Sequence, residues 1–112
     1  MIDRTALTRA QNDVAFGDDG WLTFYLTGAL EQHVSMKDAL IELRTVNLEG
    51  AEYGFVYAKV PVSMNVVDIE KRIAQVRELA AKAEVEIDVI DLDASPDVER
   101  SKFYTLWQAT SS

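Results

Sequence analysis

Apolar residues recur every three or four positions along residues 66–83, the spacing of one face of an α-helix. The residues of this stripe are Ile69, Ile73, Val76, Ala80 and Ala83. The opposite face carries two acid-first pairs at i,i+4 spacing, Asp68 with Arg72 and Glu78 with Lys82. With Asn65 as a capping residue, the pattern predicts an amphipathic helix over residues 66–83.

Two-residue alternation, or a high content of β-branched and aromatic residues, predicts five strands. They cover residues 21–26, 45–48, 53–62, 84–93 and 102–107. The second and third are joined by turn residues and form a predicted hairpin, whose far end Pro61 limits. In the fourth the alternation slips phase near Val89 and Ile90, which predicts a β-bulge there.

Two further helices are predicted from capping signals. Asp3 caps a helix over residues 3–16, with Gly17 as a left-handed stop. Its apolar positions are Ala6, Leu7, Ala10 and Val14. Ser35 and Asp38 approximate a capping box and favour a helix over residues 36–44, while a strand through residues 40–48 is the alternative. Ser95 and Pro96 begin a short turn or helix.

The order of these elements predicts the fold class. Apart from the two ends of the chain, the elements follow in the order strand, helix, strand, strand, helix, strand. This order is typical of an α+β, ferredoxin-like split βαββαβ antiparallel sheet with both helices on one face. We expect one domain over residues 1–112, with its core at about 21–93, the helix over 3–16 as an addition and residues 95–112 as an extension that adds an edge strand. The second sheet face is left to Trp21, Tyr25, Tyr53 and Tyr57, either as a dimer or partner surface or covered by the additional helix.

Composition excludes several classes of function. Nineteen acidic against eleven basic residues give a net charge of −8, the wrong sign for direct nucleic-acid binding. The chain has no cysteine, so it has no disulfide or thiolate site. It shows neither an apolar run that could span a membrane nor a signal-peptide pattern, which favours a cytoplasmic protein.

The residues needed for most catalytic or cofactor sites do not occur in a usable pattern. His33 is the single histidine and has no cysteine to pair with. The glycines do not match a phosphate-binding loop, and Asp91 with Asp93 does not begin a calcium loop. We therefore expect no enzyme activity, no metal and no cofactor.

The excess of acidic residues is local. Residues 84–99 contain seven acids and no lysine or arginine. If they line one edge of the sheet, they attract a basic partner; the alternative is an edge strand whose charges prevent aggregation. The predicted partner-binding residues are Glu84, Glu86, Asp88, Asp91, Asp93 and Asp97, with Tyr104 and Trp107 as aromatic anchors.

Three consecutive segments resemble a known family. Residues 53–62, 67–80 and 84–88 resemble the strand, long helix and following strand of the regulator of ribonuclease E activity B family, over residues 53–90 in the main. That family consists of small acidic ferredoxin-like proteins that bind and inhibit an RNA-degrading enzyme.

Together with the charge layout, the resemblance implies a non-enzymatic bacterial or phage protein that inhibits or regulates a basic, nucleic-acid-handling partner. Such a protein is of the ribonuclease-regulator, immunity-protein or phage-inhibitor type. The alternative is a self-associating ferredoxin-like module, a homodimer that is structural or holds a small ligand.

Overall fold

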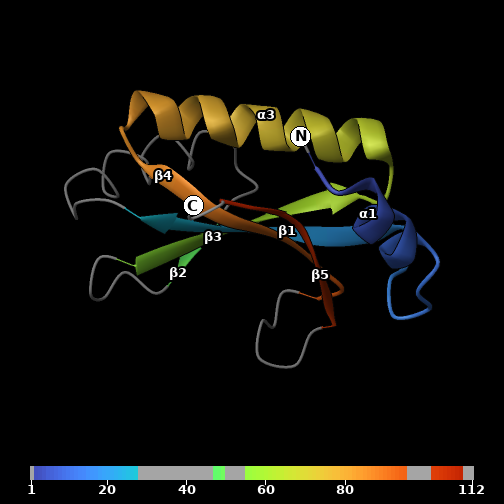
Figure 1. Ribbon diagram of the computed structural model, residues 1–112. Coiled ribbons are helices and arrows are strands. Elements are labelled where there is room, and N and C mark those ends of the chain that lie inside the picture. Colours follow the sequence, from blue (N-terminus) through green and yellow to red (C-terminus); the bar gives the residue numbers. More distant parts are fainter. Residues whose placement is uncertain (1, 28–46, 50–54, 96–101, 110–112) are drawn as a thin grey trace.

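The computed structural model describes residues 2–27, 47–49, 55–95 and 102–109 (Figure 1). The predicted α+β class is confirmed. The elements are α1 (Arg4–Gln11), β1 (Asp19–Thr27), β2 (Asn47–Glu49), β3 (Phe55–Ser63), α3 (Val66–Lys82), β4 (Glu86–Asp93) and β5 (Phe103–Gln108). The helix predicted over residues 36–44 and the turn at Pro96 lie outside the described residues.

The strands form one antiparallel sheet in the order β2-β3-β1-β4-β5. The central strand, β1, pairs with β3 and β4, so that Leu22 lies opposite Val60 on one side and Leu92 on the other. Because both neighbours are antiparallel to β1, β3 and β4 are parallel to each other, and α3 connects them. The predicted hairpin of β2 with β3 and the edge position of β5 are confirmed.

Pro61 does not end its strand, because β3 continues to Ser63. Pro61 lies opposite Trp21 of β1, whereas the pairing with β2 reaches only as far as Lys59. Proline lacks the backbone N–H with which a strand residue donates to one of its two neighbouring strands. It is therefore accommodated at a point where β3 is paired with β1 but lies beyond the described end of β2.

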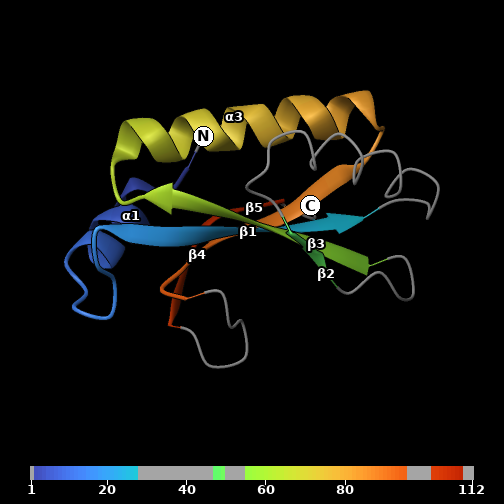
Figure 2. The same cartoon turned by 180° about the vertical axis from the view of Figure 1, so that it is seen from behind.

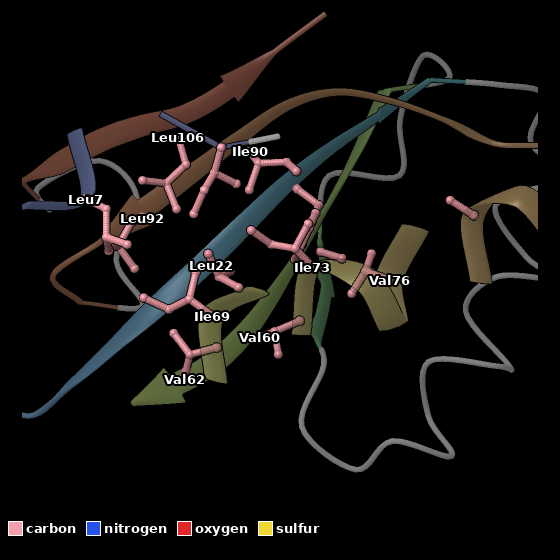
Figure 3. Close-up of a cluster of buried hydrophobic side chains, with 14 of the residues drawn as sticks. Leu7, Leu22, Val60, Val62, Ile69, Ile73, Val76, Ile90, Leu92 and Leu106 are labelled. Carbon is pink, nitrogen blue, oxygen red and sulfur yellow. The ribbon is translucent and has the colours of Figure 1, made fainter. Parts of the chain in front are cut away.

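α3 lies across one face of the sheet (Figures 1 and 2). Asn65 Oδ1 accepts a hydrogen bond of 2.8 Å from the Val67 N–H, which confirms the predicted N-cap. The buried residues of the helix are Ile69, Ile73, Val76 and Ala80, which belong to the predicted stripe. They pack over Leu22, Val60 and Leu92 in one core cluster (Figure 3).

Only one of the two predicted ion pairs on α3 is present. Glu78 and Lys82 form it, with 3.6 Å between their charged atoms. The Asp68 carboxylate instead accepts hydrogen bonds from the backbone N–H and the hydroxyl of Ser63, at 2.9 and 3.1 Å. Asp68 therefore ties the end of β3 to the first turn of α3.

α1 begins as predicted but ends earlier. Asp3 accepts hydrogen bonds from the N–H groups of Thr5 and Ala6, as an N-cap should. The helix stops at Gln11 because Asp13 instead binds the Ala15 N–H through its side chain. The predicted extension to residue 16 is thus wrong: Val14 is fully exposed, and Gly17 does not adopt the left-handed conformation.

α1 packs on the same side of the sheet as α3. Its buried residues, Leu7 and Ala10, belong to the same core cluster as Ile69, and Leu7 lies near Leu92 and Leu106 (Figure 3). The Asp3 N–H also donates to the Leu106 carbonyl of β5 at 2.6 Å. The reading in which the additional helix covers the second sheet face is therefore wrong.

Replacing a buried residue of α3 tests this core. We expect Ile69→Ala to lower the free energy of unfolding by about 2–5 kcal/mol, because it leaves a cavity between α3 and the sheet. Val67→Ala, on the exposed side of the same helix, should change it by less than about 0.5 kcal/mol. Urea denaturation measures both, and equal losses would contradict the packing described.

Candidate functional site

The face of the sheet opposite α3, here called the open face, carries a line of polar residues across four strands. Leu22 and Phe24 point into the core, so the alternation of β1 places Thr23 on the open face. Thr23 lies opposite Lys59 of β3 and Asp91 of β4, and Asp91 lies opposite Thr105 of β5. These four residues form the central polar row: Lys59, Thr23, Asp91 and Thr105.

Hydrogen bonds connect this row with Asp93. The Thr105 hydroxyl donates to Asp91 Oδ1 at 2.8 Å, and the Thr23 hydroxyl donates to Asp93 Oδ2. Thr23, Lys59 and Asp93 are at most 1% exposed and Asp91 is 6% exposed. Burial of ionisable groups is costly unless opposite charges and hydrogen bonds compensate. Here Lys59 supplies positive charge beside the Asp93 carboxylate.

Burial shifts both carboxyl groups toward the protonated form. It raises the pKa of Asp93 to about 6, assisted by the charge of Asp91 and opposed by Thr23 and Lys59. Burial also raises the pKa of Asp91, against hydrogen bonds from Thr105 and Tyr25. The open face therefore holds two carboxyl groups that retain protons more readily than exposed ones.

Aromatic residues flank the polar row. Tyr25 lies opposite Val89, and Trp21 lies opposite Asp93; both aromatic side chains are half-buried. Phe103, paired with Asp93 from β5, is 55% exposed. The structure thus places Trp21 and Tyr25 on the second face, as their alternation predicts. The side chains of the other two predicted members, Tyr53 and Tyr57, lie outside the described set.

The open face contains a hollow of about 290 Å³ beside the polar row. Its lining residues are Tyr25, Asp88, Val89, Asp91, Thr105 and Gln108. We call it the Tyr25 hollow. It brings an exposed carboxylate and a buried one to the same depression, next to an aromatic ring and a hydroxyl.

A β-bulge accounts for the position of Asp88. Tyr25 pairs with Val89 and the next residue, Leu26, pairs with Ile87, so Asp88 is the extra residue of β4. The predicted bulge is therefore present, one residue before Val89. Bulges re-aim side chains; this one makes Asp88 a lining residue of the Tyr25 hollow.

The acidic segment does not form an edge, because β4 lies between β1 and β5. The prediction of an acidic edge strand is wrong, since β5 supplies the neighbour on that side. Asp91 and Asp93 are buried, whereas Glu84, Glu86 and Asp88 are exposed. Asp97 lies outside the described residues. The described exposed charge of the segment is thus concentrated at the start of β4.

Glu84 lies in the turn between α3 and β4 and has a positive φ of 56°. The N–H groups of Glu84 and Val85 donate to the carbonyls of Ala81 and Ala80, which is the Schellman arrangement at the end of a helix. Glycine is the usual residue at this left-handed position. The chain keeps an exposed acid there instead.

The predicted aromatic anchors both contact the helical side of the molecule. The Tyr104 hydroxyl donates to Asp13 Oδ2 at 2.7 Å, and the Tyr104 ring lies 5.9 Å from that of Phe16. The Arg77 guanidinium lies 5.1 Å from the centre of the Trp107 ring. Tyr104 therefore lies away from the Tyr25 hollow, whereas Trp107 lines a separate hollow of about 370 Å³ together with Arg77 and the predicted acid Glu86.

Sequence reasoning missed Thr23, Lys59 and Thr105 as members of the site. Lys59 stands between Ala58 and Val60, both buried, and Thr23 stands between two buried residues of β1. A lone polar residue inside an otherwise apolar strand was the available signal. Which strands bring such residues together depends on the register, which is not visible in local sequence.

Two classes of feature are absent from the part of the chain that the structure describes. No group of three or more histidine, aspartate or glutamate side chains is arranged to hold a metal ion there. Within the same residues, no helix is both long and apolar enough to cross a membrane.

The raised pKa of Asp93 predicts a pH dependence of stability. Between its ordinary pKa of 3.8 and the folded value of about 6, the folded protein binds a proton that the unfolded chain has released. The stabilisation that this proton gives the folded state is fully present below pH 3.8 and is lost as the pH rises through about 6. The shift corresponds to about 3 kcal/mol. Between pH 4 and 7, the free energy of unfolding of the wild type should therefore fall by about 3 kcal/mol more than that of Asp93→Asn.

Urea titrations across this range measure the difference. Asp18→Asn removes one charge from an exposed loop and is the matched control. Equal flattening of the pH profile in both variants would contradict the role of burial at Asp93.

Asp13 predicts the opposite dependence. Hydrogen bonds from Lys102 and Tyr104 lower the pKa of Asp13 to about 2, and the Lys102 ammonium lies 2.6 Å from the carboxylate. Its contribution is present above the ordinary pKa of 3.8 and lost as the pH falls through about 2. We expect Asp13→Asn to be less stable than the wild type at pH 6, with the gap closing toward pH 2. Thermal unfolding at several pH values measures this, and a constant gap would refute it.

No family model, curated protein or solved structure matches the chain in the three comparisons made with known proteins.

Proposed function

We propose that this protein is a non-enzymatic binding protein that inhibits or regulates a basic, nucleic-acid-handling protein, which docks on the open face. The observation that carries the proposal is the separation of charge between the helices, in which bases exceed acids, and the other described residues, in which acids exceed bases. The resemblance of residues 53–90 to an inhibitor family of ribonuclease regulators adds support for the class of partner.

The helices carry most of the positive charge that the structure describes. α1 and α3 together contain six basic and three acidic residues. Outside them, the described residues include ten acids and only two bases, Lys59 and Lys102. Lys59 is buried, and Lys102 binds Asp13. A basic partner is therefore attracted to the described residues outside the helices, and on the open face it meets Asp88, an exposed acid that lines the Tyr25 hollow.

The open face also offers apolar contact area. Phe103 is exposed, and Trp21 and Tyr25 are half-buried with their side chains on this face. Aromatic residues supply most of the binding energy in many interfaces, while charges at the rim mainly raise the association rate. In this proposal Glu86 and Asp88 attract the partner and the aromatic residues hold it.

We propose that the arrangement is ferredoxin-like. The described strand order β2-β3-β1-β4, with every neighbouring pair antiparallel, is the order that a split βαβ unit produces and supports this assignment. A split βαβ unit has its two crossover helices on one face, and α3 is the crossover helix that the structure describes. On the other face the central polar row is buried, so the contact area for a partner comes from Phe103, Trp21 and the lining of the Tyr25 hollow.

Self-association through the same face is the second candidate. The exposed Phe103 and the half-buried Trp21, which pair with Asp93 from β5 and from β1, favour it, since apolar patches often mark subunit interfaces. A chain with a net charge of −8 opposes such pairing at low salt. Light scattering separates the candidates: a monomer supports the heterologous partner, and a dimer that persists at every salt concentration supports self-association.

A pull-down from nuclease-treated lysate, washed in parallel at low and high salt, tests the proposal. We expect a stoichiometric basic partner that is lost at high salt. With that partner purified, the double variant Glu86→Lys, Asp88→Lys should slow association by about tenfold or more and flatten its dependence on salt, because it removes the attraction. Stopped-flow kinetics measures both effects.

The matched control is Asp18→Lys, Glu78→Lys, which changes the net charge equally at exposed positions away from the open face. Equal slowing in both double variants would show that only total charge matters and would contradict docking on this face. Recovery of the bait with itself alone would contradict the proposed function.

A further inference from the structure

We infer that the Tyr25 hollow receives an arginine side chain of the basic partner. This inference rests on the proposed function and adds to it the chemical group that the open face recognises. It is carried by three observations: the size of the hollow, the two carboxylates in its lining and the aromatic ring beside them.

The hollow is large enough for a single side chain. Sites for small molecules and cofactors usually measure about 300–1,000 Å³, and this hollow measures about 290 Å³. Its lining mixes acceptors with one ring and one aliphatic side chain, and it contains no lysine or arginine. A positively charged group of limited size is the occupant that complements such a lining.

The two carboxylates have different roles because they differ in burial. Asp91 is 6% exposed and is held in place by Thr105 and Tyr25. A carboxylate has about four acceptor sites, so acceptor capacity remains after these two hydrogen bonds. Asp88 is exposed and lines the same hollow. An arriving cation therefore meets one buried acceptor and one exposed acceptor.

The bulge in β4 makes this combination possible. In a regular strand, Asp88 would alternate with Val89 and point toward α3, away from Asp91. As the extra residue between the Tyr25 and Leu26 pairings, it lines the hollow with Val89 instead. An acid is thus moved from the helical side of the strand to the open face.

Arginine fits this lining better than lysine does. The planar guanidinium stacks on aromatic rings and donates up to five hydrogen bonds in a fixed fork, and it loses its hydration more easily than an ammonium group. Tyr25 offers the ring, while Asp88, Asp91 and Gln108 offer acceptors. A second copy of this chain is a poor donor of that arginine because it carries the same net charge of −8.

Titration of the isotopically labelled protein with N-acetyl-arginine methylamide, followed by NMR amide shifts, tests the inference without the partner. We expect saturable shifts concentrated at the residues of the hollow. The citrulline analogue has the same shape without the charge and should produce no saturable shift. The lysine analogue should bind more weakly than the arginine analogue.

Two variants that each lose one negative charge show whether the arginine analogue binds at the hollow. Asp88→Asn should weaken binding of the arginine analogue about two- to fivefold, the range of a partly exposed ion pair. Asp18→Asn, in an exposed loop at the start of β1, should leave the affinity unchanged. Equal weakening in both variants, shifts centred elsewhere, or equal binding of the citrulline analogue would each overturn the inference.

The outcome is separable from that of the proposed function. If a basic partner is captured but its affinity is the same for the wild type and Asp88→Asn, the hollow is not its contact and the inference fails while the proposed function stands. If the NMR amide signals of the residues that line the hollow shift with protein concentration in the absence of any analogue, a second copy occupies the hollow and the inference also fails. Specific binding of the arginine analogue supports the assignment of an arginine side chain to the hollow, while a pull-down without a partner would still contradict the proposed function.

Discussion

Packing of one face of β1 beneath α3 is the interaction on which the other features depend. Leu22, Phe24 and Leu26 are at most 1% exposed, and burying each such side chain contributes about 1.5–3 kcal/mol. Because side chains alternate along a strand, this packing fixes Thr23 and its neighbours on the open face. A slip of one residue would exchange the two faces, so the core determines the geometry of the candidate site as well as the stability of the fold.

The central polar row sets the chemical character of the open face. A lysine and two carboxyl groups are buried in a sheet whose described helices lie on the other side. Their mutual charges and the threonine hydroxyl groups offset part of the cost of burial. The result is a face with few described positive charges, flanked by aromatic rings, in a molecule whose helices carry an excess of bases.

The local pattern of apolar and polar residues was sufficient to predict α3, whose apolar stripe, N-cap and bounds follow from the sequence almost to the residue. It failed at Val14, because a single side-chain hydrogen bond of Asp13 competed successfully with the helix. It also failed for the acidic segment, since the placement of β4 between two strands is decided by pairing across the chain. The polar row was missed for the same reason: its members come from four strands, and only the register brings Lys59 and Thr105 onto one line with Thr23.

The strand order has a consequence for biosynthesis. The central strand is the first to leave the ribosome, yet its partners lie far behind it: Leu22 pairs with residues 38 and 70 positions later. Until they emerge, both edges of an apolar strand stay without their native neighbours, and exposed edges of this kind invite pairing with other chains. Closing such long loops also slows folding. The interval between synthesis of β1 and synthesis of β4 is therefore the period in which the apolar central strand is most exposed to pairing with other chains.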